Sequence, residues 1–217
     1  MKFNKDDEEK LEVEELQEKS VIVLKSGDDD AMSRTIGLFG DLDDEKSGDI
    51  IYSMLMLREN AEQLVPVEDG AENEFEKINR PIEFIMATPG GSADNMFGIY
   101  DIMRLIQQEN VDIVTTGVGY VMSAGVLLLA AGTKGQRRIG KHCRVMIHAV
   151  IGGNHGSLHN LENELEEVKN VQEQYTKALV QETSMTTRQL KKLLDRKINI
   201  YLTAEEAVEY GIADIII

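Results

Sequence analysis

The chain has 217 residues, 42% of them hydrophobic, which is long enough to bury a core as one domain. Its formal net charge of −16 argues against a nucleic-acid partner, because nucleic-acid binding is built on a basic face. The acidic N-terminus lacks a secretory pattern, no run of eighteen uncharged apolar residues occurs, and there is one cysteine. We therefore expect no membrane contact and a cytoplasmic or equivalent reducing compartment.

In chain order, residues 1–19 form an acidic leader that we expect to be solvated and poorly ordered. Residues 20–217 then read as a single domain in which short β-rich runs alternate with longer helical patterns. This alternation is typical of an α/β fold with a largely parallel sheet. The predicted strands are residues 20–25, 34–40, 82–88, 111–117, 144–150 and 213–217.

Helical periodicity predicts the crossover helices between these strands. The predicted helices are residues 48–63, 93–108, 123–131, 158–181, 187–195 and 204–210. Residues 64–81 are polar and acidic with two prolines, so we expect a surface loop there rather than a domain boundary.

The helix predicted at 158–181 carries a heptad-like apolar stripe that Gln172 interrupts. Such a stripe packs either on the sheet of its own domain or on a partner helix of another subunit, and the sequence leaves both interpretations open. The stripe consists of Leu158, Leu161, Leu165, Val168, Tyr175 and Leu179.

Three other motifs are poor candidates for sites. Residues 135–142 (GQRRIGKH) match a phosphate-binding loop only until His142, where a magnesium-binding hydroxyl is needed, and they precede a strand rather than a helix. His155 and His159 have helical spacing but lack the glutamate of a zinc peptidase. Cys143 is separated from His148 by strand alternation, so a buried structural thiol is the simpler interpretation. We expect no metal and no cofactor.

Ser123 stands where a predicted strand and turn enter an apolar helix (GYVMSAGVLLLAAG). There its hydroxyl would meet the free amides and dipole of a helix N-terminus, as an acyl-transfer nucleophile requires. Serine is also a favoured N-cap, and from this residue alone capping is the simpler explanation.

Two further residues suit the same chemistry. His148 lies near the end of a predicted strand, at the sheet edge where α/β proteins bind ligands, although a lone histidine can also be a core residue. Asp195 ends a helix, where the dipole disfavours an unpaired carboxylate, although it can also be simply exposed.

The glycines of residues 87–95 (ATPGGSADN) offer backbone amides to a ligand. The amides of Gly91 and Ala124 would together bracket an oxyanion. The alternative is an ordinary strand-to-helix turn capped by Ser92 or Asp94.

The segments 88–107, 119–153 and 202–214 resemble the ClpP family, the proteolytic subunits of the Clp protease. The resemblance extends from about Arg34 to the C-terminus. It implies a ClpP/crotonase-type spiral of parallel strands and helices, with a protruding handle over about 151–185. It also implies that Ser123 is the nucleophile, His148 the base and Asp195 the orienting acid. We expect substrate to contact Gly90, Gly91, Ser92, Val150, Ile151 and Gly152, partly as an added strand.

The resemblance further implies an ATP-independent serine endopeptidase core that cleaves unfolded polypeptides inside stacked rings, heptamers forming a tetradecamer, fed by an AAA+ unfoldase. The open alternatives are a catalytically inactive ring subunit, a phage prohead-type protease, and an acyl-CoA enzyme of the crotonase type. Residues around Asp195 match the family poorly, three extra residues separate the double glycine from Ser123, and Glu83 and Ile85 replace the aromatic residues that dock an unfoldase. These departures weaken the expectation of unfoldase docking more than that of catalysis.

Overall fold

The computed structural model describes residues 33–67, 75–153, 155–195 and 199–217. The expected leader and the strand expected at 20–25 lie outside these residues. The described strands are β1 (Thr35–Phe39), β2 (Glu62–Pro66), β3 (Phe75–Asn79), β4 (Ile82–Thr88), β5 (Ile113–Met122), β6 (Arg138–Ile139), β7 (Arg144–Ile147), β8 (Ile200–Leu202) and β9 (Ile215–Ile216). The described helices are α2 (Asp44–Glu59), α3 (Ala93–Gln108), α4 (Ala124–Ala130), α5 (Leu158–Glu182), α6 (Thr187–Leu194) and α7 (Ala204–Glu209).

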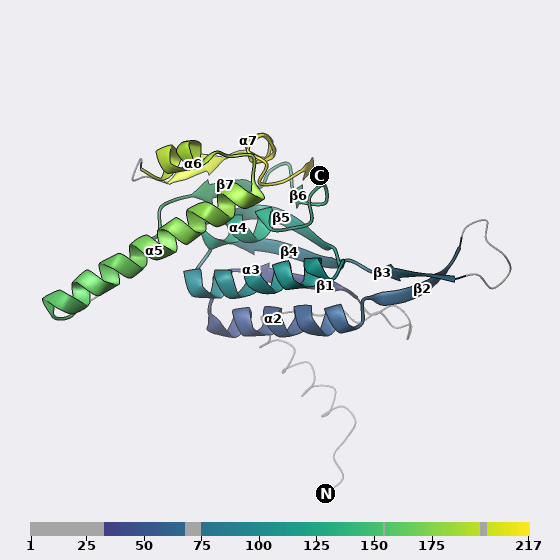
Figure 1. The fold of residues 1–217 in the computed structure, drawn as a ribbon. Helices are drawn as coiled ribbons and strands as arrows, with labels where there is room; N and C mark the ends of the chain where they lie inside the picture. The colour runs from purple at the N-terminus through teal and green to yellow at the C-terminus, as the bar shows by residue number, and fades with distance from the viewer. Residues whose placement is uncertain (1–32, 68–74, 154, 196–198) are drawn as a thin grey trace, which may run out of the picture.

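Seven of the described strands form one sheet in the order β1-β4-β5-β6-β9, with β7 paired to β5 and β8 paired to β7. Every pairing in this sheet is parallel except β7 with β8. The prediction of an α/β domain with a largely parallel sheet is therefore confirmed (Figure 1).

Strand β5 is longer than predicted and changes neighbour along its length. Its first half pairs with β6 at Thr116 and Gly117, and its last residues pair with β7 from Tyr120 onward. Between the two pairings Gly119 adopts a positive φ of 64°, which a residue without a Cβ tolerates. This bend lets one strand carry the chain from the main sheet to the edge where His148 follows β7.

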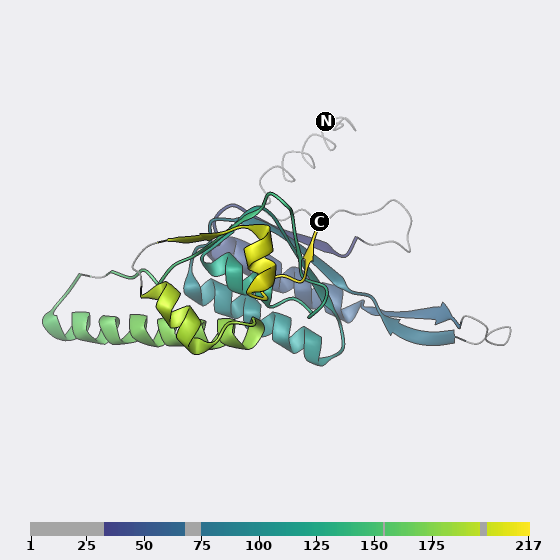
Figure 2. The same ribbon diagram turned by 90° about the horizontal axis from the view of Figure 1, so that it is seen from above.

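The prediction of a loop at residues 64–81 is wrong for its described parts. Strands β2 and β3 pair antiparallel there and form a hairpin that extends away from the body (Figures 1 and 2). Its surface location is as expected, because Leu64, Phe75 and Ile78 are all exposed. Neither strand has the alternation of apolar and polar residues that predicts a half-buried strand, because the hairpin packs against no core.

The helices adjoin one another in sequence order around the sheet: α2 contacts α3, α3 contacts α4, and α4 contacts α5. All seven residues of α4 are buried, which explains its uniformly apolar sequence and holds its N-terminus firmly inside the domain.

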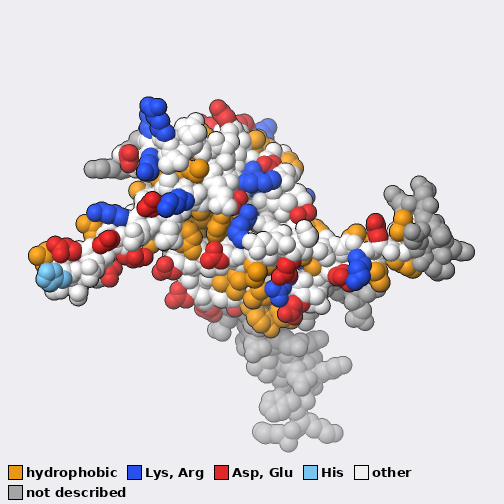
Figure 3. Space-filling view, in the orientation of Figure 1, with side chains coloured by type: hydrophobic (Ala, Val, Ile, Leu, Met, Phe, Trp, Pro, Cys, Tyr) orange, Lys and Arg blue, Asp and Glu red, His pale blue; other side chains and the backbone are white. Residues whose placement is uncertain are grey.

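The buried end of helix α5 confirms that its apolar stripe packs on its own domain, and packing on a helix of another subunit stays a prediction for the exposed end. Tyr175 and Leu179 are buried in the body, whereas Leu158 and Leu165 are exposed on the part that projects beyond it (Figure 1). In the space-filling view, acidic side chains lie along this projecting part and hydrophobic side chains gather where α5 meets the body (Figure 3).

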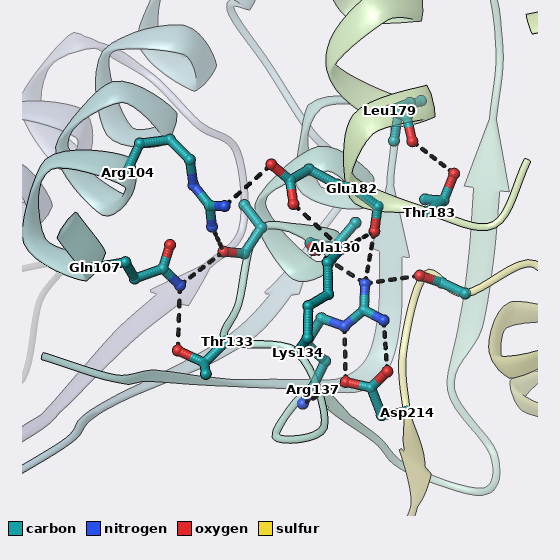
Figure 4. Close-up of polar contacts among 12 residues, drawn as sticks. Arg104, Gln107, Ala130, Thr133, Lys134, Arg137, Leu179, Glu182, Thr183 and Asp214 are labelled. Atoms are coloured by element: carbon teal, nitrogen blue, oxygen red, sulfur yellow. Dashed lines mark hydrogen bonds and ion pairs between the residues drawn. The ribbon is translucent and has the colours of Figure 1, made fainter. Parts of the chain in front are cut away.

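A polar cluster beneath the end of α5 joins segments that are distant in sequence (Figure 4). The carboxylate of Glu182, almost fully buried, accepts a hydrogen bond from Tyr100 and pairs with Arg104 and Lys134. Arg137, also buried, binds both carboxylate oxygens of Asp214 and donates to backbone carbonyls at the ends of three segments. The cluster therefore fastens α3, α5 and the C-terminal segment to the loop before β6.

Candidate active site

A pocket of about 370 Å³ opens where β4, β5 and β7 end and α3, α4 and α5 come together. It brings together the expected nucleophile and base with most of the expected substrate-binding residues. The lining residues are Asp41, Pro89, Gly90, Gly91, Ser92, Ala93, Met96, Ser123, Ala124, His148, Val150, Ile151 and Tyr175.

Ser123 occupies the turn between β5 and α4 in a strained conformation, with φ 53° and ψ −120°. L-residues other than glycine rarely adopt a positive φ, and such strain typically costs about 1–3 kcal/mol and clusters at functional sites. The Ser123 side chain makes no capping hydrogen bond, although it precedes the first residue of α4. The capping interpretation is therefore wrong for this serine, and its hydroxyl is free to face the pocket.

The double glycine lies directly against this turn. A Cβ added to Gly90 would come within 2.6 Å of the Ser123 Cβ, so the two segments approach more closely than side chains would permit. Gly90 and Ser92 are fixed by backbone hydrogen bonds with Leu42, at 2.8 and 3.1 Å. Ser92, rather than Asp94, is the side-chain cap of α3.

Two amides at this junction have no protein acceptor among the described residues. The Gly91 N–H lies between the two hydrogen bonds to Leu42 and takes part in neither, and the Ala124 N–H belongs to the first residue of α4. The first amides of a helix lack intrahelical acceptors and favour negative charge. Both amides line the pocket and are the donors that an oxyanion would need.

His148 is one residue beyond β7, which is shorter than predicted, and its half-buried ring lines the pocket. Its Nδ1 lies 2.5 Å from the carbonyl oxygen of Ala149. Because a carbonyl oxygen can only accept, this contact is a hydrogen bond in the tautomer that carries the proton on Nδ1. Nε2 of the neutral ring is then the nitrogen with a free lone pair, as a general base requires.

Asp195 does not line this pocket. It caps the C-terminal end of α6, is exposed, and contributes to a neighbouring hollow that Ala149 and Val150 also line. Across residues 33–67, 75–153, 155–195 and 199–217, no hydrogen bond joins the Asp195 carboxylate to His148. The role of Asp195 therefore stays a prediction.

The segment after His148 is not a strand in the structure. The amide of Val150 donates to Oε1 of Gln172 at 2.7 Å. This hydrogen bond uses a backbone N–H that was expected to bind substrate. Gly152 lies against Val168 of α5 and outside the pocket. Sequence reasoning missed Gln172 as a contact of this segment, although its interruption of the heptad was a visible signal.

The poorer candidates lie elsewhere. Burial raises the pKa of the Cys143 thiol to about 11, so the thiol stays protonated at neutral pH and is a weak nucleophile. His159 lies 3.6 Å from Glu162 on the exposed part of α5. Among the described residues, no group of three His, Cys, Asp or Glu side chains is placed to hold a metal ion. Within the same residues, no helix has the length and apolar content that crossing a membrane requires.

Comparison with known proteins gives two concordant results. Residues 72–217 match the family described as Clp protease. The chain is also 36% identical over 143 residues to the ATP-dependent Clp protease proteolytic subunit 2 of Prochlorococcus marinus (strain NATL2A), covering 65% of this chain and 69% of the relative. The residues that match the family include Ser123 and His148. The two results together show that the chain belongs to the Clp protease family.

Proposed function

We propose that this chain is a serine endopeptidase that cleaves unfolded polypeptides, with Ser123 as nucleophile and His148 as general base. The observation that carries the proposal is an uncapped, strained serine sharing one pocket with an imidazole and two unpaired amides. Membership of the Clp protease family supports the same reaction.

In the proposed mechanism, Nε2 of His148 takes the Ser123 proton as the hydroxyl oxygen attacks a peptide carbonyl carbon. The bond formed is the acyl ester, and the resulting imidazolium returns its proton to the leaving amine as the peptide C–N bond breaks. The amides of Gly91 and Ala124 stabilise the tetrahedral oxyanion, a contribution of about 3–4 kcal/mol per donor in related chemistry. Water then hydrolyses the ester by the same route in reverse.

We assign Asp195 the role of orienting acid. In support, the hollow that Asp195 lines is also lined by Ala149, the residue whose carbonyl oxygen contacts His148 Nδ1. Loss of the contact with Ala149 would leave Nδ1 available to a carboxylate. A carboxylate is a stronger partner than a carbonyl for an imidazolium, because the hydrogen bond becomes charge-assisted.

Assembly completes the proposal. The exposed leucines on the projecting part of α5 support a handle that packs against a second ring, and we propose stacked heptamers whose chamber encloses the pocket. Hydrolysis of unfolded chains in this chamber needs no ATP, and an AAA+ unfoldase would supply them.

A second candidate is a catalytically inactive ring subunit. It is favoured by one specific observation, namely that His148 Nδ1 is bonded to Ala149 rather than to an acid. The same architecture would then support active copies without cleaving peptides itself.

Treatment of the purified, assembled protein with a fluorophosphonate separates these candidates. The proposed peptidase is expected to carry one adduct at Ser123 and none at Ser92, which lines the same pocket but caps α3. Peptide mapping by mass spectrometry locates the adduct, and a native mass measurement reports the ring. A correctly assembled ring with no adduct at Ser123 would support the inactive subunit instead.

Gly91→Ala tests the proposed oxyanion site. The new Cβ would lie 2.0 Å from the carbonyl oxygen of Leu42, so the glycine segment must move and carry its amide away. We expect kcat for a model peptide to fall by about 10²-fold, the cost of losing one oxyanion donor. In Gly98→Ala the Cβ of a helical residue would meet only Ile51 at 3.5 Å, so this control should retain wild-type kcat. Equal kcat in the two variants would argue against the assignment of Gly91.

A further inference from the structure

Tyr175 lies at the base of the pocket and comes from a part of the chain far from Ser123 in sequence. It belongs to the buried part of α5, and its side chain is only 4% exposed although it lines the pocket. In the sequence it reads as one more member of the apolar stripe. Unlike the other residues of the stripe, Tyr175 has a hydroxyl that can donate a hydrogen bond.

The Tyr175 hydroxyl donates a hydrogen bond of 3.1 Å to the backbone carbonyl oxygen of Ser123. Two other hydrogen bonds hold the Ser123 backbone. The Ser123 amide donates to the Met146 carbonyl at 2.8 Å, and the Ser123 carbonyl also accepts from the Val126 amide at 3.0 Å. The Met146 bond belongs to the sheet and the Val126 bond to the first turn of α4. Among the residues that the structure describes, the Tyr175 phenol alone connects the Ser123 backbone to a helix other than α4.

The phenol is suited to this role chemically. Burial raises the pKa of Tyr175 well above its ordinary value, so the hydroxyl remains a donor throughout the range in which a histidine base operates. A buried tyrosine hydroxyl normally has a partner, and here the acceptor is the carbonyl of a residue in a strained conformation. Such a conformation persists only where its surroundings enforce it.

The position of Tyr175 along α5 gives the contact a wider consequence. It is the residue at which the helix enters the body, since Leu158, Leu161 and Leu165 before it are exposed and Leu179 after it is fully buried. A shift of α5 along or about its axis therefore displaces the phenol relative to the Ser123 carbonyl.

We propose that Tyr175 is a positioning residue that holds the Ser123 backbone in its reactive conformation and links that conformation to the placement of α5. The inference rests on the proposed role of Ser123 as nucleophile. Tyr175 acts through Ser123 and exchanges no proton with substrate.

The test is Tyr175→Phe in the full-length, assembled protein. This substitution keeps the aromatic ring and removes only the hydroxyl that donates the hydrogen bond. The rate of fluorophosphonate labelling is measured as a function of probe concentration. We expect the limiting rate to fall about fivefold, the equivalent of one neutral hydrogen bond, while the half-saturating probe concentration is unchanged. A general loss of packing would not produce this separation between reaction and binding.

Tyr100→Phe is the matched control. Its hydroxyl is also buried and donates to a single acceptor, Glu182, but it does not line the pocket. Tyr100→Phe is expected to label at the wild-type limiting rate.

Three results would overturn the inference in distinguishable ways. Labelling of Tyr175→Phe at the wild-type rate would refute the role of Tyr175 and leave the proposed function intact, because Ser123 would still react. An equal fall in the limiting labelling rate of Tyr100→Phe would also refute the role of Tyr175, since the slower labelling would then reflect a general loss of stability. A wild-type ring that takes no label would refute the proposed function and this inference with it.

Discussion

Ser123→Ala is expected to abolish peptide hydrolysis without unfolding the protein. Removing the serine of a catalytic triad lowers kcat by about 10⁶-fold in a well-studied serine protease of another fold. The Ser123 hydroxyl makes no capping hydrogen bond, so its removal leaves no buried partner unsatisfied. We expect the free energy of unfolding to change by no more than about 0.5 kcal/mol, and ring mass to be unchanged. Peptidase assays, urea unfolding and native mass spectrometry measure the three quantities.

Ser123→Gly makes the comparison sharper. Because glycine adopts φ 53° without steric cost, this variant should be about 1 kcal/mol more stable than Ser123→Ala while equally inactive. Such a result would show that the strained backbone is maintained for the sake of the side chain. Residual hydrolysis above about a hundredth of the wild-type rate in either variant would mean that another residue is the nucleophile.

Arg137→Met is expected to produce the largest loss of stability. Arg137 is only 4% exposed, and it binds Asp214 through Nε and Nη2 at 2.8 and 2.5 Å. Its Nη1 also donates to the carbonyls of Ala130, Glu182 and Gly211. Methionine would fill much of the volume but remove all of these hydrogen bonds. The Glu182 carbonyl would keep Lys134 as a donor and Asp214 Oδ2 would keep the Gly135 amide. Asp214 Oδ1 and the carbonyls of Ala130 and Gly211 would lose the guanidinium, so we expect a loss of about 3–5 kcal/mol in urea unfolding.

Arg138→Met, at the adjacent residue that begins β6, is the matched control. Arg138 pairs with Glu83 at 3.6 Å, and both side chains are more than 40% exposed, so its replacement should cost no more than about 1 kcal/mol. Similar losses in the two variants would contradict the importance assigned to the buried pair.

The Arg137 pair also predicts a direction of pH dependence. Hydrogen bonding to the Arg137 guanidinium holds the pKa of Asp214 below its ordinary value. The unfolded carboxyl therefore binds a proton first as pH falls, and the stabilisation is complete above about pH 4 and lost below it. The stability difference between wild type and Arg137→Met should accordingly narrow in acid.

Local pattern was sufficient for most of the fold. The predicted helix at 93–108 coincides with α3, and the helix at 158–181 with α5 to within one residue, because their apolar residues recur at helical spacing. The strand at 82–88 coincides with β4, whose residues alternate between buried and half-buried. The hairpin of β2 (EQLVP) and β3 (FEKIN) was missed because neither strand alternates apolar and polar residues, as a half-buried strand would.

Strand boundaries near the site were less predictable. The apolar run before Ser123 predicted a strand ending at residue 117, but β5 continues to Met122 because β7 pairs with its last three residues. In the other direction, β7 ends at Ile147, since its partner β8 pairs only as far as that residue. Both boundaries depend on strands that are distant in sequence.

By itself, the sequence determined the types of residue at the candidate site, the order of the elements and the likeness to the Clp protease family, because these follow from local spacing and from recognisable motifs. Four features of the site came from tertiary contacts alone. Ser123 is uncapped and strained, the amides of Gly91 and Ala124 have no acceptor among the described residues, His148 Nδ1 meets the carbonyl of Ala149, and Tyr175 reaches the Ser123 carbonyl. The physical reason is that backbone strain, unpaired donors and tautomers depend on which distant segments meet, and no local periodicity encodes those contacts.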